Sequence, residues 1–131
     1  MAVNYLIDTN AIIDAQSRRL PEEGLGFLAA IMNIDFTISF VSFIEYMSFA
    51  NLSQEAEEFI KLANLIHINQ KIIDTTILLR KRYHIKMPDA IIAATTLEFD
   101  LILISHNLKD FSKIEGLKLL DPYHLPVNVQ I

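Results

Sequence analysis

The sequence predicts an α/β fold of the three-layer sandwich type, in which a largely parallel sheet of four or five strands carries helices on both faces. Two observations support this prediction. Short apolar runs alternate with longer segments of helical periodicity, as in chains built from β–α–β units. The run 101–104 is apolar without interruption, which is typical of a strand covered on both faces.

The composition is that of one ordered domain, which we expect to span residues 1–131. The chain is 52% hydrophobic and 21% charged, so it has ample material for a core. It contains no cysteine, which excludes disulfides and thiolate metal sites. Asp8 interrupts the first apolar run, and no run reaches the ~18 residues of a membrane span. We therefore expect a soluble cytoplasmic protein.

Local residue patterns predict the elements in order. Runs rich in apolar, β-branched and aromatic residues predict strands at 3–7, 36–41, 65–68, 101–104 and 117–120. Apolar spacing and helix-start residues predict helices at 10–15, 21–32, 42–50, 53–64, 70–82 and 87–97. Pro21 and Pro88 suit first helical turns, and Ser42 with Glu45 has the spacing of a capping box. The polar segment 105–111 predicts a turn.

Acidic and amide side chains follow the predicted strands. The carboxyl ends of parallel strands share one edge of a sheet, where ligands bind in such folds. Asp8, Glu45 and Asp89 are expected near that edge, with Asn107 and Asp110 as further candidates. Each acid also has a structural explanation: Asp8 as a helix N-cap, Glu45 in its capping box, and Asp89 beside a helix N-terminus. Those explanations do not account for all three meeting at one edge.

Clustered carboxylates repel one another unless they share a cation. Oxygen ligands suit Mg²⁺ or Mn²⁺, and such an ion supports phosphodiester hydrolysis. The histidine spacings match no metal or catalytic template, and no glycine-flanked serine suggests a serine hydrolase.

The charge distribution adds one further candidate region. The net charge of −5 counts against nucleic-acid binding through bulk charge alone. Six of the 11 Lys and Arg residues nevertheless lie at 18–19 and 80–86. These two stretches are either solvated surface or regions that attract a polyanion.

Four stretches together resemble a PIN domain, and more narrowly the VapC-type toxins of bacterial toxin–antitoxin pairs. The resemblance covers nearly the whole chain. Its most specific element is Pro88-Asp89-Ala90. The four stretches are Asp8-Thr9-Asn10 after a strand, Glu45 in the third helix, 87–95, and 103–107 before Asp110-Phe111. The resemblance implies a PIN-like sandwich, an Mg²⁺-dependent ribonuclease, an antitoxin partner that inhibits it, and a homodimer.

The resemblance also implies roles for individual residues. Asp8, Glu45 and Asp89 match the family's acidic positions and are expected to hold the metal ion. Mn²⁺ can take the place of Mg²⁺ at this site. The fourth acidic position falls on Asn107, which can bind through its carbonyl oxygen but brings no negative charge. Residues expected to position the RNA substrate or the ligands are Thr9, Asn10, Ser105 and Asp110.

Two alternatives remain open from the sequence. The same fold could serve as a non-catalytic module that binds protein or RNA, with its acids acting as helix caps. It could also hydrolyse another phosphate ester or DNA with the same metal chemistry.

Overall fold

The structure, a computed structural model, describes residues 4–129 and confirms the α/β prediction. Its five strands are all parallel and form one sheet in the order β3-β2-β1-β4-β5. The strands are β1 (Tyr5–Ile7), β2 (Thr37–Ser39), β3 (Asn64–Ile66), β4 (Ile102–Ile104) and β5 (Lys118–Leu120). Because β1 is the central strand, the residue after it stands at the middle of the sheet edge.

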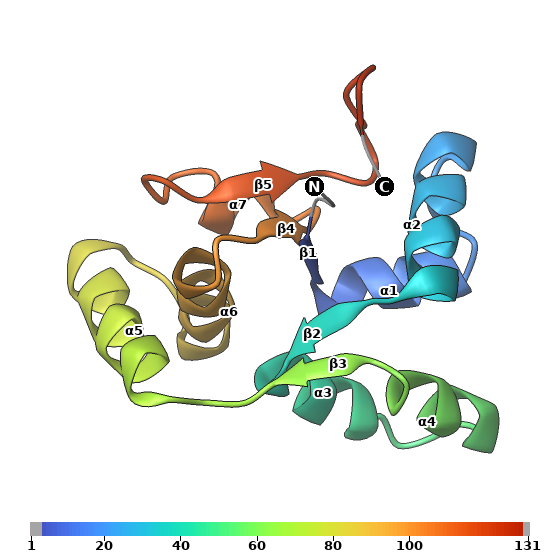
Figure 1. Cartoon of the computed structure of the whole chain (residues 1–131), viewed down its shortest axis with the longest axis horizontal. Helices are drawn as coiled ribbons and strands as arrows, with labels where there is room; N and C mark the ends of the chain where they lie inside the picture. Colours follow the sequence, from blue (N-terminus) through green and yellow to red (C-terminus); the bar gives the residue numbers. More distant parts are fainter. Residues whose placement is uncertain (1–3, 130–131) are drawn as a thin grey trace.

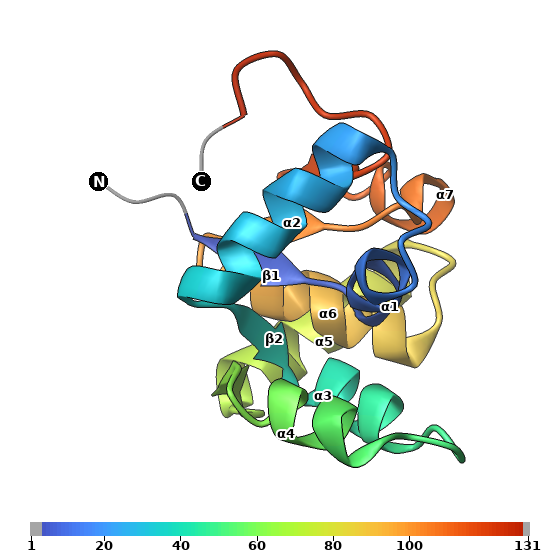
Figure 2. The same cartoon turned by 90° about the vertical axis from the view of Figure 1, so that its right-hand side faces the viewer.

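Helices cover both faces of this sheet. In Figure 1, α5 and α6 lie on one side of the strands and α1 and α2 on the other; Figure 2 shows the second side from the front. The helices are α1 (Thr9–Gln16), α2 (Glu22–Ile34), α3 (Phe40–Met47), α4 (Gln54–Ile60), α5 (Gln70–Arg82), α6 (Met87–Glu98) and α7 (Leu108–Phe111). Within residues 4–129, no helix has both the length and the apolar character needed to cross a membrane.

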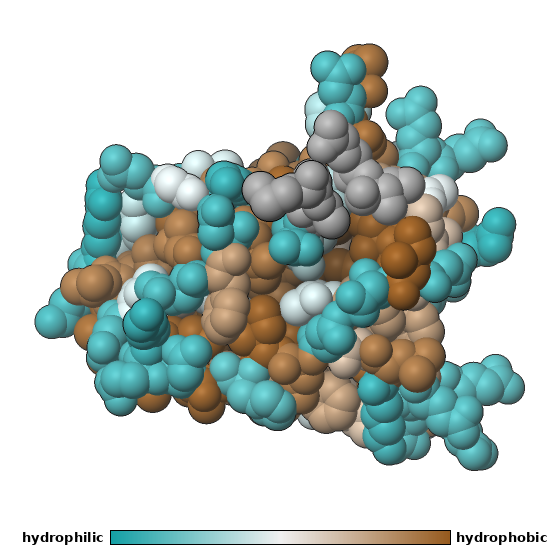
Figure 3. Space-filling model, in the orientation of Figure 1, coloured by the Kyte–Doolittle hydropathy of each residue, from teal (hydrophilic) through white to brown (hydrophobic). Residues whose placement is uncertain are grey.

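The core consists of two apolar clusters separated by the sheet. Successive side chains of a strand point to opposite faces. Tyr5 and Ile7 therefore pack with Leu28 of α2, whereas Leu6 packs with Ile92 of α6. The space-filling view shows hydrophilic side chains around the periphery of one face and hydrophobic ones toward its middle (Figure 3). The three layers thus follow from the alternation within these short strands.

Most predicted elements are present, with shifted ends. The helix predicted at 70–82 has those bounds in α5, and Pro88 lies in the first turn of α6, as expected. The helices predicted at 42–50 and 53–64 end earlier, at Met47 and Ile60. The strand predicted at 3–7 is observed as Tyr5–Ile7; its first residue lies outside the described part of the chain.

The junction between β2 and α3 corrects the prediction that Ser42 caps this helix. The helix begins at Phe40, and the Ser39 hydroxyl accepts a hydrogen bond from the Ser42 amide at 3.1 Å. Ser39 lies three residues before Ser42, and its hydroxyl satisfies the Ser42 amide at the start of the helix. The strand therefore ends before residue 41, its predicted last residue. The capping box is therefore wrong, because Glu45 lies in the second turn of α3, beyond the reach of a capping residue.

The segment 105–111 also differs from the predicted turn, because its second half is the short helix α7. The Asn107 side chain accepts a hydrogen bond from the Asp110 amide at 3.4 Å and caps this helix. Phe111 is fully buried in the cluster on the α6 side of the sheet. Burial of this one aromatic ring holds a polar segment in helical form.

Gly24 in α2 allows a close approach of the C-terminal segment. A Cβ atom added at this position would lie 2.0 Å from the backbone oxygen of Pro122. At Gly26, two residues along the same helix, an added Cβ would meet nothing within 4 Å. The two glycines therefore differ in their structural role although both lie inside one helix.

We predict that Gly24→Ala lowers the free energy of unfolding by about 1–3 kcal/mol, because the methyl group overpacks against the Pro122 backbone. Gly26→Ala is the matched control and is expected to raise it by about 0.5–1 kcal/mol through helix propensity. Urea denaturation followed by circular dichroism measures both. Equal effects of the two substitutions would contradict the close approach.

Candidate functional site

Asp8 follows the central strand and is held by the backbones of two elements. Its amide donates to the Ile104 carbonyl at 3.0 Å, and its own carbonyl accepts from the Ala11 amide at 3.1 Å. Its side chain makes no capping bond to α1. Instead the Ser105 hydroxyl donates to Oδ2 of Asp8 at 2.8 Å. Asp8 therefore occupies the predicted N-cap position of α1, but its carboxylate does not cap the helix.

The electrostatic environment of Asp8 disfavours its charge. The residue is 8% exposed, and this burial is the main reason that its pKa is raised to about 6. The negative charges of Asp89 and Glu45 raise the pKa further, while the hydrogen bond from Ser105 lowers it. At neutral pH the group is mostly ionised at a cost in stability, and a cation beside it would offset that cost.

Glu45 is directed to the same edge by α3, which follows β2 without an intervening loop. The Thr9 hydroxyl donates to Oε1 of Glu45 at 3.0 Å, so the residue after Asp8 orients the second acid. Glu45 is otherwise exposed to solvent. The pair Asp8-Thr9 therefore contributes one carboxylate and positions another.

Asp89 lies in the first turn of α6 and is partly buried. Its pKa is raised, first by burial and then by the charges of Asp110 and Glu45, whereas the charge of Lys86 lowers it. The N-terminal end of α6 favours a negative charge at this position. Asp89 thus belongs to the same group of interacting charges as Asp8.

Ser105, Asn107 and Asp110 extend this group through hydrogen bonds. The Ser105 hydroxyl that donates to Asp8 also accepts from the Asn107 amide at 3.1 Å. The Asn107 side-chain amide donates to Oδ2 of Asp110 at 3.1 Å. A continuous chain of contacts therefore runs from Asp8 to Asp110. Asn107 orients that acid and caps α7 at the same time.

The structure brings most of the predicted site residues together. Charge interactions link Asp8, Glu45, Asp89 and Asp110, and hydrogen bonds attach Thr9, Ser105 and Asn107. Asn10 is the exception, since its exposed side chain makes no hydrogen bond to this group within residues 4–129.

The carboxylates do not form a ready three-ligand metal cluster. In the described part of the chain, no three His, Cys, Asp or Glu side chains are grouped closely enough to hold a metal ion. The donors nevertheless suit Mg²⁺, which typically binds one or two carboxylates and keeps several waters. The raised pKa values of Asp8 and Asp89 come in part from neighbouring negative charge, and a cation relieves that repulsion.

Two basic residues near the site were not found from the sequence. Lys109 and Lys113 line a cavity that also includes Asp110, Arg80 and residues 83–86. The sequence pattern singled out the basic stretches at 18–19 and 80–86, but not these two lysines. The spacing of Lys109 and Lys113, four residues apart around α7, was a signal, but the segment was expected to be a turn.

Comparison with known proteins places these features in a family. The family model described as PIN domain matches residues 5–117. No curated protein shows a significant match to the sequence.

Solved structures are similar over nearly the whole chain. A chain of a toxin–antitoxin complex from Klebsiella pneumoniae is 32% identical with a TM-score of 0.76, covering 93% of this chain and 100% of that one. A chain of VapBC-1 from nontypeable Haemophilus influenzae is 26% identical with a TM-score of 0.71, at 93% and 100% coverage. FitAcB from Neisseria gonorrhoeae, at 20% identity and a TM-score of 0.72, covers 92% and 99% and shares the fold.

The resemblance seen in the sequence is thus confirmed by independent comparisons. The match to the family model includes β1, the carboxylate group and α7. With these matches and the parallel sheet that carries the site, the chain belongs to the PIN domain family.

Proposed function

We propose that the protein is an Mg²⁺-dependent endoribonuclease and the toxin of a toxin–antitoxin pair. The observation that carries this proposal is the buried Asp8 carboxylate at the end of the central strand. Its charge interacts with the charges of Asp89 and Glu45. Membership of the PIN domain family and likeness to a chain of a toxin–antitoxin complex support it.

The proposed metal ligands are Asp8 and Asp89, with Glu45 binding directly or through water. When bound, Mg²⁺ or Mn²⁺ supplies a nucleophilic water and offsets charge on the phosphate and on the leaving oxygen. Ser105 fixes the rotamer of Asp8 through its hydroxyl, and Thr9 does the same for Glu45. Asn107 donates a hydrogen bond to Asp110 and so orients it near Asp89. Asp110 adds negative charge there but is not a proposed ligand.

The proposed partners are an RNA substrate, a cognate antitoxin and a second copy of the chain, all in the cytoplasm. The similar Klebsiella and Haemophilus structures are a toxin–antitoxin complex and VapBC-1. Several large apolar side chains on α5 and at the start of α6 are exposed, and they suit burial in a homodimer. Among them are Ile73, Ile77, Leu78 and Met87.

One observation favours the alternative of a non-catalytic binding module, namely that no three acidic side chains are grouped as metal ligands within residues 4–129. Titration calorimetry with Mn²⁺ separates the two functions. We expect binding by the natural protein and its loss in Asp8→Asn and Asp89→Asn. No Mn²⁺ binding in the natural protein would favour the module.

The remaining alternative is hydrolysis of DNA or of another phosphate ester. Cleavage of RNA alone, leaving 5′-phosphate ends, is the expected result when matched RNA and DNA oligonucleotides are compared. Cleavage of DNA at an equal rate would assign the site to a different substrate class.

We predict that Asp8→Asn and Asp89→Asn each reduce Mg²⁺-dependent RNA cleavage by about a hundredfold or more, since each removes a carboxylate that would hold the cation, and the cation is what stabilises the transition state. Asp74→Asn, on the exposed face of α5, is the matched control and is expected to keep full activity. Cleavage of a labelled oligoribonucleotide measures all three. Undiminished activity in both site variants would overturn the proposed mechanism.

The raised pKa of Asp8 gives a separate prediction about stability without metal. Because the folded pKa, about 6, exceeds the ordinary value of 3.8, the native state holds the proton longer than the unfolded state. The stability that Asp8 contributes is therefore fully present at low pH, where the group is protonated. It falls as pH rises from about 4 to 6. Above that window the loss amounts to about 3 kcal/mol.

Asp8→Asn should therefore raise the free energy of unfolding in EDTA at pH 7.5 and change it much less at pH 4. Its amide carbonyl can still accept the bond from Ser105, so the main change is the loss of a buried charge. Urea denaturation at the two pH values tests this, with Asp74→Asn as control. A variant less stable than the natural protein at pH 7.5 would contradict the electrostatic account.

A further inference from the structure

A cavity lined by four Lys and Arg side chains, called here the basic cavity, adjoins the carboxylate group. We propose that this basic cavity holds the phosphodiester backbone of a single-stranded polynucleotide next to the bond presented to the acids. Its volume is about 480 Å³, and its lining includes Arg80, Lys86, Lys109, Lys113, Tyr83 and Asp110. The inference rests on the proposed nuclease function and names where its substrate is held.

The cavity concentrates positive charge in a chain whose net charge is −5. Four cations, from α5, the 83–86 segment and the α7 region, line it against the single acid Asp110. Within residues 4–129, none of the four forms an ion pair; the Arg and Lys residues that do are Arg19, Arg82 and Lys118. The positive charge is therefore available to an anionic ligand.

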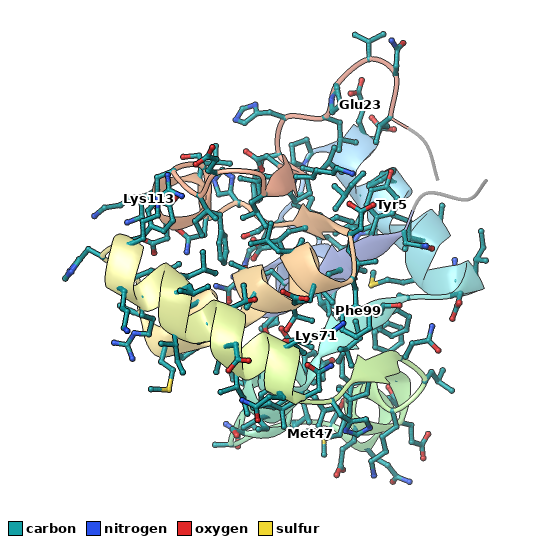
Figure 4. The ribbon with its side chains drawn as sticks, turned by 60° about the vertical axis from the view of Figure 1, so that its left-hand side comes forward. Tyr5, Glu23, Met47, Lys71, Phe99 and Lys113 are labelled. Carbon is teal, nitrogen blue, oxygen red and sulfur yellow. The ribbon has the colours of Figure 1, made fainter. Side chains whose placement is uncertain are left out.

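Local contacts fix the walls of the cavity. Lys113 Nζ donates to the carbonyl oxygen of His84 at 2.7 Å, a neutral acceptor that leaves the ammonium charge uncompensated. The Tyr83 hydroxyl accepts from the Glu115 amide at 3.0 Å, which ties the end of α5 to the segment after α7. In Figure 4, Lys113 lies near the C-terminal end of α5 and Lys71 near its other end. These contacts hold two elements distant in sequence around one space.

Two residues connect the cavity to the carboxylate group. Asp110 lines the cavity and accepts a hydrogen bond from Asn107, which in turn contacts Ser105. Lys86 also lines the cavity, and its charge acts on Asp89. The cavity and the carboxylate group therefore share Asp110, and the charge of Lys86 in the cavity wall acts on Asp89.

The chemistry favours a polynucleotide over an acidic protein segment. A polynucleotide cleaved at the acids must continue past them, and its next phosphates need cations to offset the repulsion from Asp8 and Asp89. The bases of a single strand also stack on aromatic side chains, and Tyr83 and His84 line the same cavity. An acidic peptide bound there would gain from the cations alone and would be repelled by the adjoining carboxylates.

The test compares Lys109→Gln/Lys113→Gln with the control Lys61→Gln/Lys71→Gln, which removes two exposed lysines from α5 and the end of α4. Fluorescence anisotropy measures binding of a labelled single-stranded oligoribonucleotide in EDTA over a range of salt concentrations. Each phosphate contact changes the slope of log K against log salt by about 0.7 for single strands. The cavity variant is expected to flatten that slope by about 1.4, and the control to leave it unchanged.

A parallel measurement with DNA of the same sequence identifies the recognised group. An equal loss of DNA binding in the cavity variant assigns the cavity to backbone phosphates, and a loss confined to RNA assigns it to a ribose-containing backbone. Equal slopes for the cavity variant and the control would overturn the proposal. So would a labelled oligoglutamate that binds more tightly than the RNA and loses its binding in the cavity variant.

Because binding is measured in EDTA, the result is independent of cleavage. RNA binding that depends on these lysines, without cleavage in Mg²⁺, would support the proposed role of the basic cavity and contradict the proposed nuclease function. Cleavage by the natural protein, together with unchanged binding by the cavity variant, would retain the nuclease and reject the cavity.

Discussion

The burial of a carboxylate at the end of the central strand is the constraint on which the site depends. Asp8 leaves the sheet where β1 lies between β2 and β4, so three elements enclose it and water is largely excluded. A charge in that position is unfavourable unless its neighbours compensate it. Ser105 does so in part with one hydrogen bond, while Glu45 and Asp89 add repulsion. The arrangement is therefore less stable than an apolar sheet edge would be, which is typical of sites that bind cations.

The fold and the acidic positions could be predicted because they depend on local pattern and on the direction of parallel strands. Alternation and apolar runs predicted all five strands, and Pro88 marked the start of α6. Errors arose where two local signals competed. Ser39 and Ser42 are both suitable N-caps, and only packing of the intervening residues decides between them. The 105–111 segment is polar, yet buried Phe111 makes part of it helical.

The contacts between the acids and their supporting residues were beyond sequence analysis. Thr9 could have bonded its own helix, but it reaches Glu45, 36 residues away. Lys113 lies 29 residues from the carbonyl of His84 that it contacts. Such pairs depend on how α3 and α7 are placed against the sheet. No periodicity along the chain reports that placement.

The bond between Asp8 and Ser105 joins residues separated by 97 positions. A ribosome therefore produces most of the polypeptide before the two can meet, since β4 must emerge and pair with β1 first. A chain interrupted before β4 carries Asp8, Glu45 and Asp89 but neither the serine nor α7. The order of synthesis thus delays assembly of the site until the chain is nearly finished, and incomplete translation products lack it.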